Sequence, residues 1–84
     1  MSDDKVGVVF KYFQGAGVAG VEVLNIIRVG DSVQFLGTQT NFSQSVDSMQ
    51  ADGEDVEEAV AGDKVGIKVG GRVRLNDRVY RVSR

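Results

Sequence analysis

The chain has 84 residues with a net charge of −2, and it contains neither cysteine nor histidine. These absences exclude disulfides, thiolate metal sites and thiol nucleophiles, and they remove the usual general base near neutral pH. No apolar run approaches the roughly 20 residues that a membrane-spanning helix needs. We therefore expect one non-catalytic, cytoplasmic domain over residues 1–84, with an acidic, disordered N-terminus at residues 1–4.

Alternating apolar residues predict strands at residues 5–13, 18–24 and 32–36, with turns at 14–17 and 29–31. The first strand has apolar residues on both faces, namely Val6, Val8, Phe10 and Tyr12 against Val9 and Phe13. This pattern predicts either cover on both sides or a bend near the middle of the strand, where the inward face changes.

The glycines at residues 15–20 match the dinucleotide-binding spacing G-x-G-x-x-G. In that motif a helix must follow, so that its N-terminal N–H groups receive the pyrophosphate. Here Val21-Glu22-Val23 follows with the alternation of a strand. We interpret these glycines as a hairpin turn and expect no nucleotide site.

The stretch from residue 41 to residue 68 predicts a corner of the fold. Residues 42–50 alternate in a way that places Val46 and Met49 on opposite faces, so a β-bulge near Asp47 or Ser48 is needed if both are buried. The two strand-like runs of this stretch are joined by a loop too long for a tight hairpin. We interpret residues 51–55 of that loop as a solvated excursion, whose far side is held by two apolar residues, Val56 and Ala59.

The acidic residues of this corner do not predict a catalytic or metal site. Glu57 and Glu58 are neighbours on an extended segment and point to opposite sides. The other carboxylates lack the spacing of a calcium loop.

The clearest alternation in the chain lies at residues 64–69, with Val65, Ile67 and Val69 inward. We expect a short extended piece at 72–75, a turn at Asn76-Asp77, and a closing strand at 78–83 with Tyr80 and Val82 inward. No helical period is present. The sequence therefore predicts an all-β fold, a small closed antiparallel barrel of six or seven strands.

Charge is distributed unevenly along the chain. Residues 1–63 contain three basic and eleven acidic side chains, a net of −8, whereas residues 64–84 contain seven basic side chains and one acidic, a net of +6. In one interpretation, strands of opposite charge lie side by side and neutralise each other. In the other, the basic residues form a face for RNA phosphate or an acidic partner. The residues of that face are Lys64, Lys68, Arg72, Arg74, Arg78 and Arg81.

A series of short segments carries a family resemblance: Gly7-Val8-Val9, Val29-Gly30-Asp31, Gly37, Val46-Asp47-Ser48-Met49-Gln50, Val56-Glu57-Glu58-Ala59, the run from Ala61 to Ile67, and Asp77. Their order resembles the second domain of elongation factor Tu and related translation GTPases. It is more similar still to the C-terminal barrel of collagenase-like peptidases. The resemblance extends from about Lys5 to Val82 and is most specific between Ser48 and Ile67.

The resemblance implies a barrel that works beside another domain. In translation GTPases this barrel helps to hold the aminoacylated end of transfer RNA or contacts the ribosome, and in the peptidases it is accessory to a separate catalytic domain. The chain departs from the pattern at Asn76, where the family usually has glycine, and at Glu22, where translation factors carry a basic residue. No GTP-binding motif is present.

Two functional hypotheses follow, and neither involves catalysis, a cofactor, a metal or a membrane. In the first, the chain is a stand-alone barrel that binds transfer RNA, ribosomal RNA or another translation component. In the second, it is an adaptor barrel that docks in trans onto a larger protein partner, as the accessory barrel of the peptidases does in cis.

Overall fold

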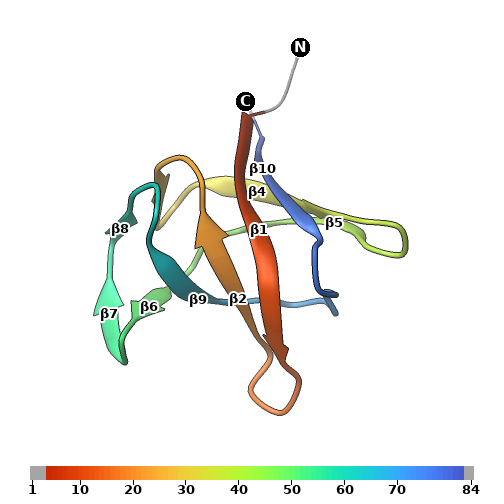
Figure 1. Ribbon diagram of the computed structural model, residues 1–84, viewed down its shortest axis with the longest axis horizontal. Helices are drawn as coiled ribbons and strands as arrows, with labels where there is room; N and C mark the ends of the chain where they lie inside the picture. The colour runs from red at the N-terminus through yellow and green to blue at the C-terminus, as the bar shows by residue number, and fades with distance from the viewer. Residues whose placement is uncertain (1–3, 83–84) are drawn as a thin grey trace.

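The computed structural model describes residues 4–82, which form short β-strands joined by turns (Figure 1). The strands are β1 (Asp4–Phe13), β2 (Val18–Val23), β3 (Ile27–Arg28), β4 (Ser32–Leu36), β5 (Asn41–Ser45), β6 (Met49–Ala51), β7 (Glu54–Val56), β8 (Glu58–Ala59), β9 (Lys64–Lys68) and β10 (Arg78–Arg81). Eight of them form one sheet in the order β5-β4-β10-β1-β2-β9-β6-β7, and β3 pairs with β8. The predicted all-β class is confirmed.

The large sheet curls around the core, but its hydrogen-bonded ladder does not close among the described residues. Its two ends are β5 and β7. The chain from β5 to β6 pairs first with β4 and then with β9, and residues 46–48 between the two strands pair with neither strand as part of the ladder. The expected closed barrel of six or seven strands is therefore corrected to an open, curled sheet of eight strands. The reason is that this connecting segment leaves β4 before it reaches β9.

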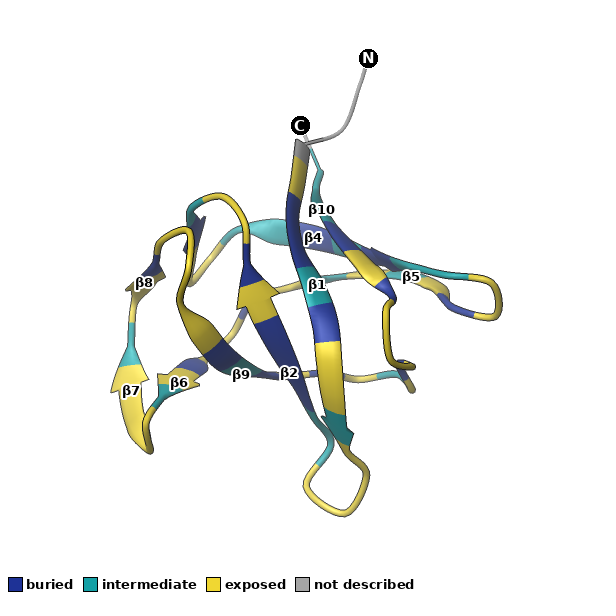
Figure 2. Ribbon diagram, viewed as in Figure 1, coloured by how far each residue is buried: buried dark blue, intermediate teal, exposed yellow. Residues whose placement is uncertain are grey.

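One apolar core lies inside the curl. Ten of its sixteen buried residues are valines, and β-branched side chains suit the pleated, half-buried surface of a sheet. Buried and less buried residues alternate along β4 and β9, and Figure 2 shows the exposed residues gathered in the turns and on the outer surface. The inward set predicted for residues 64–69 is confirmed, since Val65, Ile67 and Val69 are all buried.

β1 changes its inward face along its length. Its register shifts between Lys5 and Gly7 against β10, and between Val9 and Lys11 against β2. The first bulge adds one residue, Val6, to β1, so that Val6 and Val9 are both buried although they are three residues apart. The predicted bend is therefore confirmed, while Phe10, at the second bulge, is 42% exposed.

The corner after β6 is a tight hairpin. Ala51 pairs with Glu54, and the two residues between them, Asp52 and Gly53, have φ angles of 53° and 81°. Positive φ at both positions defines a type I′ turn, whose twist matches that of the flanking strands. Residues 52–55 are exposed, as expected of a solvated excursion, but they belong to a regular hairpin that was not expected.

Val46 and Met49 are both buried, as the predicted bulge requires. The chain achieves this by interrupting the strand at residues 46–48, so that β5 and β6 become separate strands. Val46 and Met49 thus both reach the core as expected, but through an interruption of the strand and not through a β-bulge.

The end of the chain differs from the expectation in two places. Residues 69–77 contain no strand, so the piece expected as extended at 72–75 is not part of the sheet. In β10, Val79 faces the core, whereas Tyr80 and, just after the strand, Val82 are only half-buried, so the inward face is not the one expected. At the other end, Asp4 opens β1 opposite Arg81, which corrects the expected disorder there, and residues 1–3 lie outside the described part.

Candidate binding site

The six basic residues predicted as a binding face fall into separate places. Lys64 and Lys68 lie on β9, whereas Arg78 lies on β10, and β1 and β2 separate these two strands. Arg72 and Arg74 lie in the connection between β9 and β10. All five are exposed, but the strand order divides them into three groups.

The sixth basic residue, Arg81, supports the fold. Its side chain is 26% exposed, and its Nη2 donates a hydrogen bond to the carbonyl of Ile26 at 2.9 Å. Its Nη1 lies 3.9 Å from the carboxylate of Asp31, which also accepts a hydrogen bond from the backbone N–H of Arg28. These contacts tie β10 to the residues on both sides of β3, Ile26 before it and Asp31 in the turn after it.

Two of the basic side chains, Lys64 and Arg28, lie opposite acidic side chains on a neighbouring strand. Lys64 on β9 lies directly opposite Glu22 on β2, and such cross-strand pairs of opposite charge attract each other weakly. Arg28 on β3 forms an ion pair with Glu58 on β8, with 3.0 Å between Nε and Oε1. Strands of opposite charge therefore do lie side by side at these two places.

The outer surface of β1 and β9 carries two exposed aromatic rings beside lysines. The ring of Phe10 covers Gly20, where an added Cβ would lie 3.1 Å from the Phe10 Cζ atom. The ammonium of Lys64 lies 5.7 Å from the centre of that ring, and the ammonium of Lys11 lies 5.1 Å from the centre of the Phe13 ring. Exposed cation–π contacts of this kind contribute about 0.5–1 kcal/mol each.

No helix among residues 4–82 is long and apolar enough to cross a membrane. Within the same range, no three acidic side chains converge as ligands for a metal ion.

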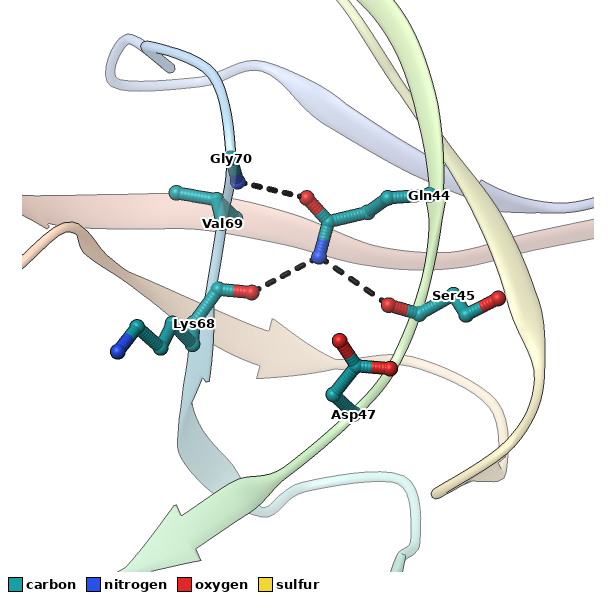
Figure 3. A pocket seen from close by; sticks show the side chains of 6 residues that line it. All are labelled: Gln44, Ser45, Asp47, Lys68, Val69 and Gly70. Atoms are coloured by element: carbon teal, nitrogen blue, oxygen red, sulfur yellow. Dashed lines mark hydrogen bonds between the residues drawn. The ribbon is translucent and has the colours of Figure 1, made fainter.

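A pocket of about 470 Å³ lies where the sheet fails to close (Figure 3). One wall is the end of β5 with the residues after it, and the other is the end of β9 with the two residues after it. We call the gap between β5 and residues 68–70 the seam. The pocket is lined by Gln44, Ser45, Asp47, Lys68, Val69 and Gly70.

Gln44 spans the seam with its carboxamide (Figure 3). Its Nε2 donates to the carbonyl of Lys68 at 2.8 Å and to that of Ser45 at 3.3 Å, and its Oε1 accepts from the N–H of Gly70 at 2.9 Å. A carboxamide carries the same kinds of donor and acceptor as a peptide group. Gln44 therefore satisfies two backbone groups of the far wall in the way a neighbouring strand would.

Phe42, two residues earlier, fills the adjoining part of the seam. Its ring stacks on Phe35 with 5.2 Å between the ring centres, and an added Cβ at Gly71 would lie 3.0 Å from its Cε2 atom. The seam is thus apolar at Phe42 and polar at Gln44. The sequence does contain a signal for Gln44, because it is the polar residue between Phe42 and Val46 on the face that these two apolar residues share.

Comparison with known proteins places the chain among peptidase domains. The model of the family described as Peptidase family U32 C-terminal domain matches residues 2–77. An uncharacterized protease of Methanocaldococcus jannaschii is 35% identical over 77 residues, which cover 90% of this chain and 19% of that protein. A collagenase of Porphyromonas gingivalis is 32% identical over 81 residues, which cover 94% of this chain and 22% of that protein. The chain thus spans about a fifth of the length of these relatives.

A solved structure has the same fold. The C-terminal domain of a protein described as a U32 peptidase from Geobacillus thermoleovorans matches with a TM-score of 0.90 and 25% identity, over 95% of this chain and 93% of that one. These findings confirm the resemblance to the C-terminal domain of collagenase-like peptidases. The resemblance to elongation factor Tu stays a prediction.

Proposed function

Because this chain belongs to the family of peptidase U32 C-terminal domains, we propose that it is a non-catalytic accessory domain that docks onto the catalytic part of a peptidase. The observation that carries the proposal is the family match over residues 2–77, in relatives about five times longer than the match. The absence of cysteine and histidine supports an accessory role, because it removes the side chains most used to activate a nucleophile. Within this proposal residues 1–84 act as one domain, and the cytoplasmic location stays a prediction.

The hypothesis of binding to transfer or ribosomal RNA has less support. The exposed rings of Phe10 and Phe13 could stack on bases, but an RNA-binding face also needs cations that converge on phosphates. In this domain the basic residues are divided among three groups, Arg81 holds the fold together, and Lys64 lies opposite Glu22. RNA binding is therefore the competing outcome of the experiment that tests the proposal.

The test measures binding of the full chain to the catalytic part of a U32 peptidase from the same organism, with transfer RNA as a parallel ligand. Isothermal titration at 50 mM and 300 mM salt should give a one-to-one protein complex whose Kd changes by less than about tenfold. RNA binding through six phosphates would weaken by about a thousandfold or more over a similar range.

The double variant Arg72→Ala, Arg74→Ala separates the two outcomes. It should leave the protein complex intact, because both side chains lie in the exposed connection rather than on the sheet. Absence of any complex with the catalytic part, together with salt-dependent RNA binding that this variant abolishes, would overturn the proposal in favour of the RNA hypothesis.

A further inference from the structure

We propose that the seam is a strand-binding site, in which an extended segment of the partner polypeptide replaces the carboxamide of Gln44 and pairs with the free edge of β5. This inference rests on the proposed function and deepens it, since it names the place at which the backbone of the partner docks. An inserted strand would join β5 to the chain after β9.

The two edges of the large sheet are protected differently. β7 has three residues, and two of them, Glu54 and Asp55, are acidic, which discourages pairing with another chain. β5 has five residues, Asn41–Ser45, with no charge and no proline. Natural proteins usually protect an edge of this kind, so an uncharged edge beside a pocket is typical of strand addition by a partner.

The register of β5 turns the backbone groups of every second residue away from β4, and of these the carbonyl of Ser45 now accepts a hydrogen bond from Gln44. Thr40 exchanges two backbone hydrogen bonds with Gly37, and Val46 bonds to Gly30 and Asp31. In an antiparallel ladder such residues alternate with residues whose N–H and C=O groups point the other way. The backbone groups of residues 41, 43 and 45 therefore point away from β4, on the side where β5 pairs with no strand among the described residues.

The opposite wall offers a matching pair of groups. The N–H of Val69 bonds to Gly17, so the carbonyl of Lys68 and the N–H of Gly70, on either side of it, point into the seam. Gln44 now satisfies both. A strand from a partner can offer the same donor and acceptor, so replacing the carboxamide exchanges hydrogen bonds without leaving a buried group unpaired.

The seam is about one strand wide. An extended glutamine side chain with its 2.8 Å hydrogen bond spans roughly 8 Å from the Gln44 Cα atom to the Lys68 carbonyl oxygen. A strand inserted between two others sets their axes about 9.5 Å apart, twice the usual spacing. The pocket adds room for side chains of the incoming segment, and the carboxylate of Asp47 lies in its lining (Figure 3).

The experiment uses three variants of the full chain and the catalytic part of the peptidase as the probe. Ser43→Pro removes an N–H that points into the seam and leaves the ladder with β4 intact, so it should weaken binding by more than about tenfold. Asp55→Pro is the matched control on the other edge and should change the Kd by less than about twofold. Gln44→Ala removes the competing carboxamide and should tighten binding by about three- to tenfold.

Amide hydrogen exchange supplies a second measurement that does not depend on variants. In the free chain the amides of Ser43 and Ser45 should exchange quickly, and in the complex they should slow by more than about tenfold. Circular dichroism checks that each variant folds. If Ser43→Pro does not fold, the exchange data on the wild-type chain decide whether the seam is the binding site.

The outcomes separate the two proposals. If the wild-type chain binds the catalytic part while Ser43→Pro binds equally well and the two amides stay fast, the seam is not the site and the accessory function stands. If the wild-type chain does not bind at all, both proposals are wrong. Weakening by Asp55→Pro as strong as that by Ser43→Pro would likewise overturn the inference, because it would not be specific to the β5 edge.

Discussion

The substitution Gly37→Ala tests a crowded contact between two residues that both belong to the family pattern. A Cβ at Gly37 would overlap the Asp77 Oδ1 atom and lie 2.7 Å from the Asp77 Cγ atom. Asp77 is only 4% exposed, and its Oδ2 accepts a hydrogen bond from the backbone N–H of Arg74 at 2.8 Å. The carboxylate therefore cannot move aside without losing that bond or displacing the hairpin that contains Gly37.

The expected loss of stability follows from these contacts. Overpacking of a filled site usually costs about 1–3 kcal/mol, and weakening the bond from Asp77 to Arg74 adds about 1 kcal/mol. For a domain of this size, each kcal/mol lowers the Tm by roughly 4–8 °C. We therefore expect Gly37→Ala to lower the free energy of unfolding by about 2–4 kcal/mol.

A double-mutant cycle measures whether Asp77 is the cause. Asp77→Ala removes the obstructing carboxylate, so Gly37→Ala in that background should cost less than about 0.5 kcal/mol. Urea unfolding followed by circular dichroism gives all four stabilities. Gly15→Ala is the control, because no atom lies within 4 Å of the position an added Cβ would take there. Equal destabilisation with and without Asp77 would show that the reasoning is wrong.

Three further predictions use the same unfolding assay. Gly7→Ala should cost about 2–3 kcal/mol, because its Cβ would lie 2.5 Å from the Val21 Cγ1 atom and 3.0 Å from a backbone oxygen; full stability would contradict this close approach. Gly53→Ala should cost about 1–2 kcal/mol, because φ is 81° in the type I′ turn, and a loss below that of Gly15→Ala would refute it. Arg28→Ala should cost less than about 1 kcal/mol, because the side chains of the ion pair with Glu58 are 59% and 50% exposed; a larger loss would show a stronger pair.

Much of the fold could be predicted from alternation alone. Residues 32–36 were expected as a strand and form β4 with the same bounds, and residues 18–24 and 64–69 each exceed β2 and β9 by one residue. These strands bury one face, so the period of their apolar residues directly reflects the core. The hairpin of β6 and β7 also had a signal, the Asp52-Gly53 pair typical of a type I′ turn, in a segment interpreted as a solvated loop.

The open ladder and the seam were harder to predict. Alternation shows which residues of a strand face inward, but not whether the last strand of a sheet reaches the first, because that depends on the path of the chain at residues 46–48. Gln44 illustrates the same limit: its inward position could be read from Phe42 and Val46, whereas its partners, Lys68 and Gly70, lie more than twenty residues away.

The pairing of β1 with β10 determines how this domain can be tethered. Asp4 lies opposite Arg81, so both ends of the described chain are at the same end of the sheet, far from the turn at residues 14–17 (Figure 1). A linker attached at either end would hold the domain at one end of the sheet only, and would leave it free to rotate relative to a neighbouring domain. Its orientation on a neighbouring domain would then be set by the surface that docks and not by the direction of the linker.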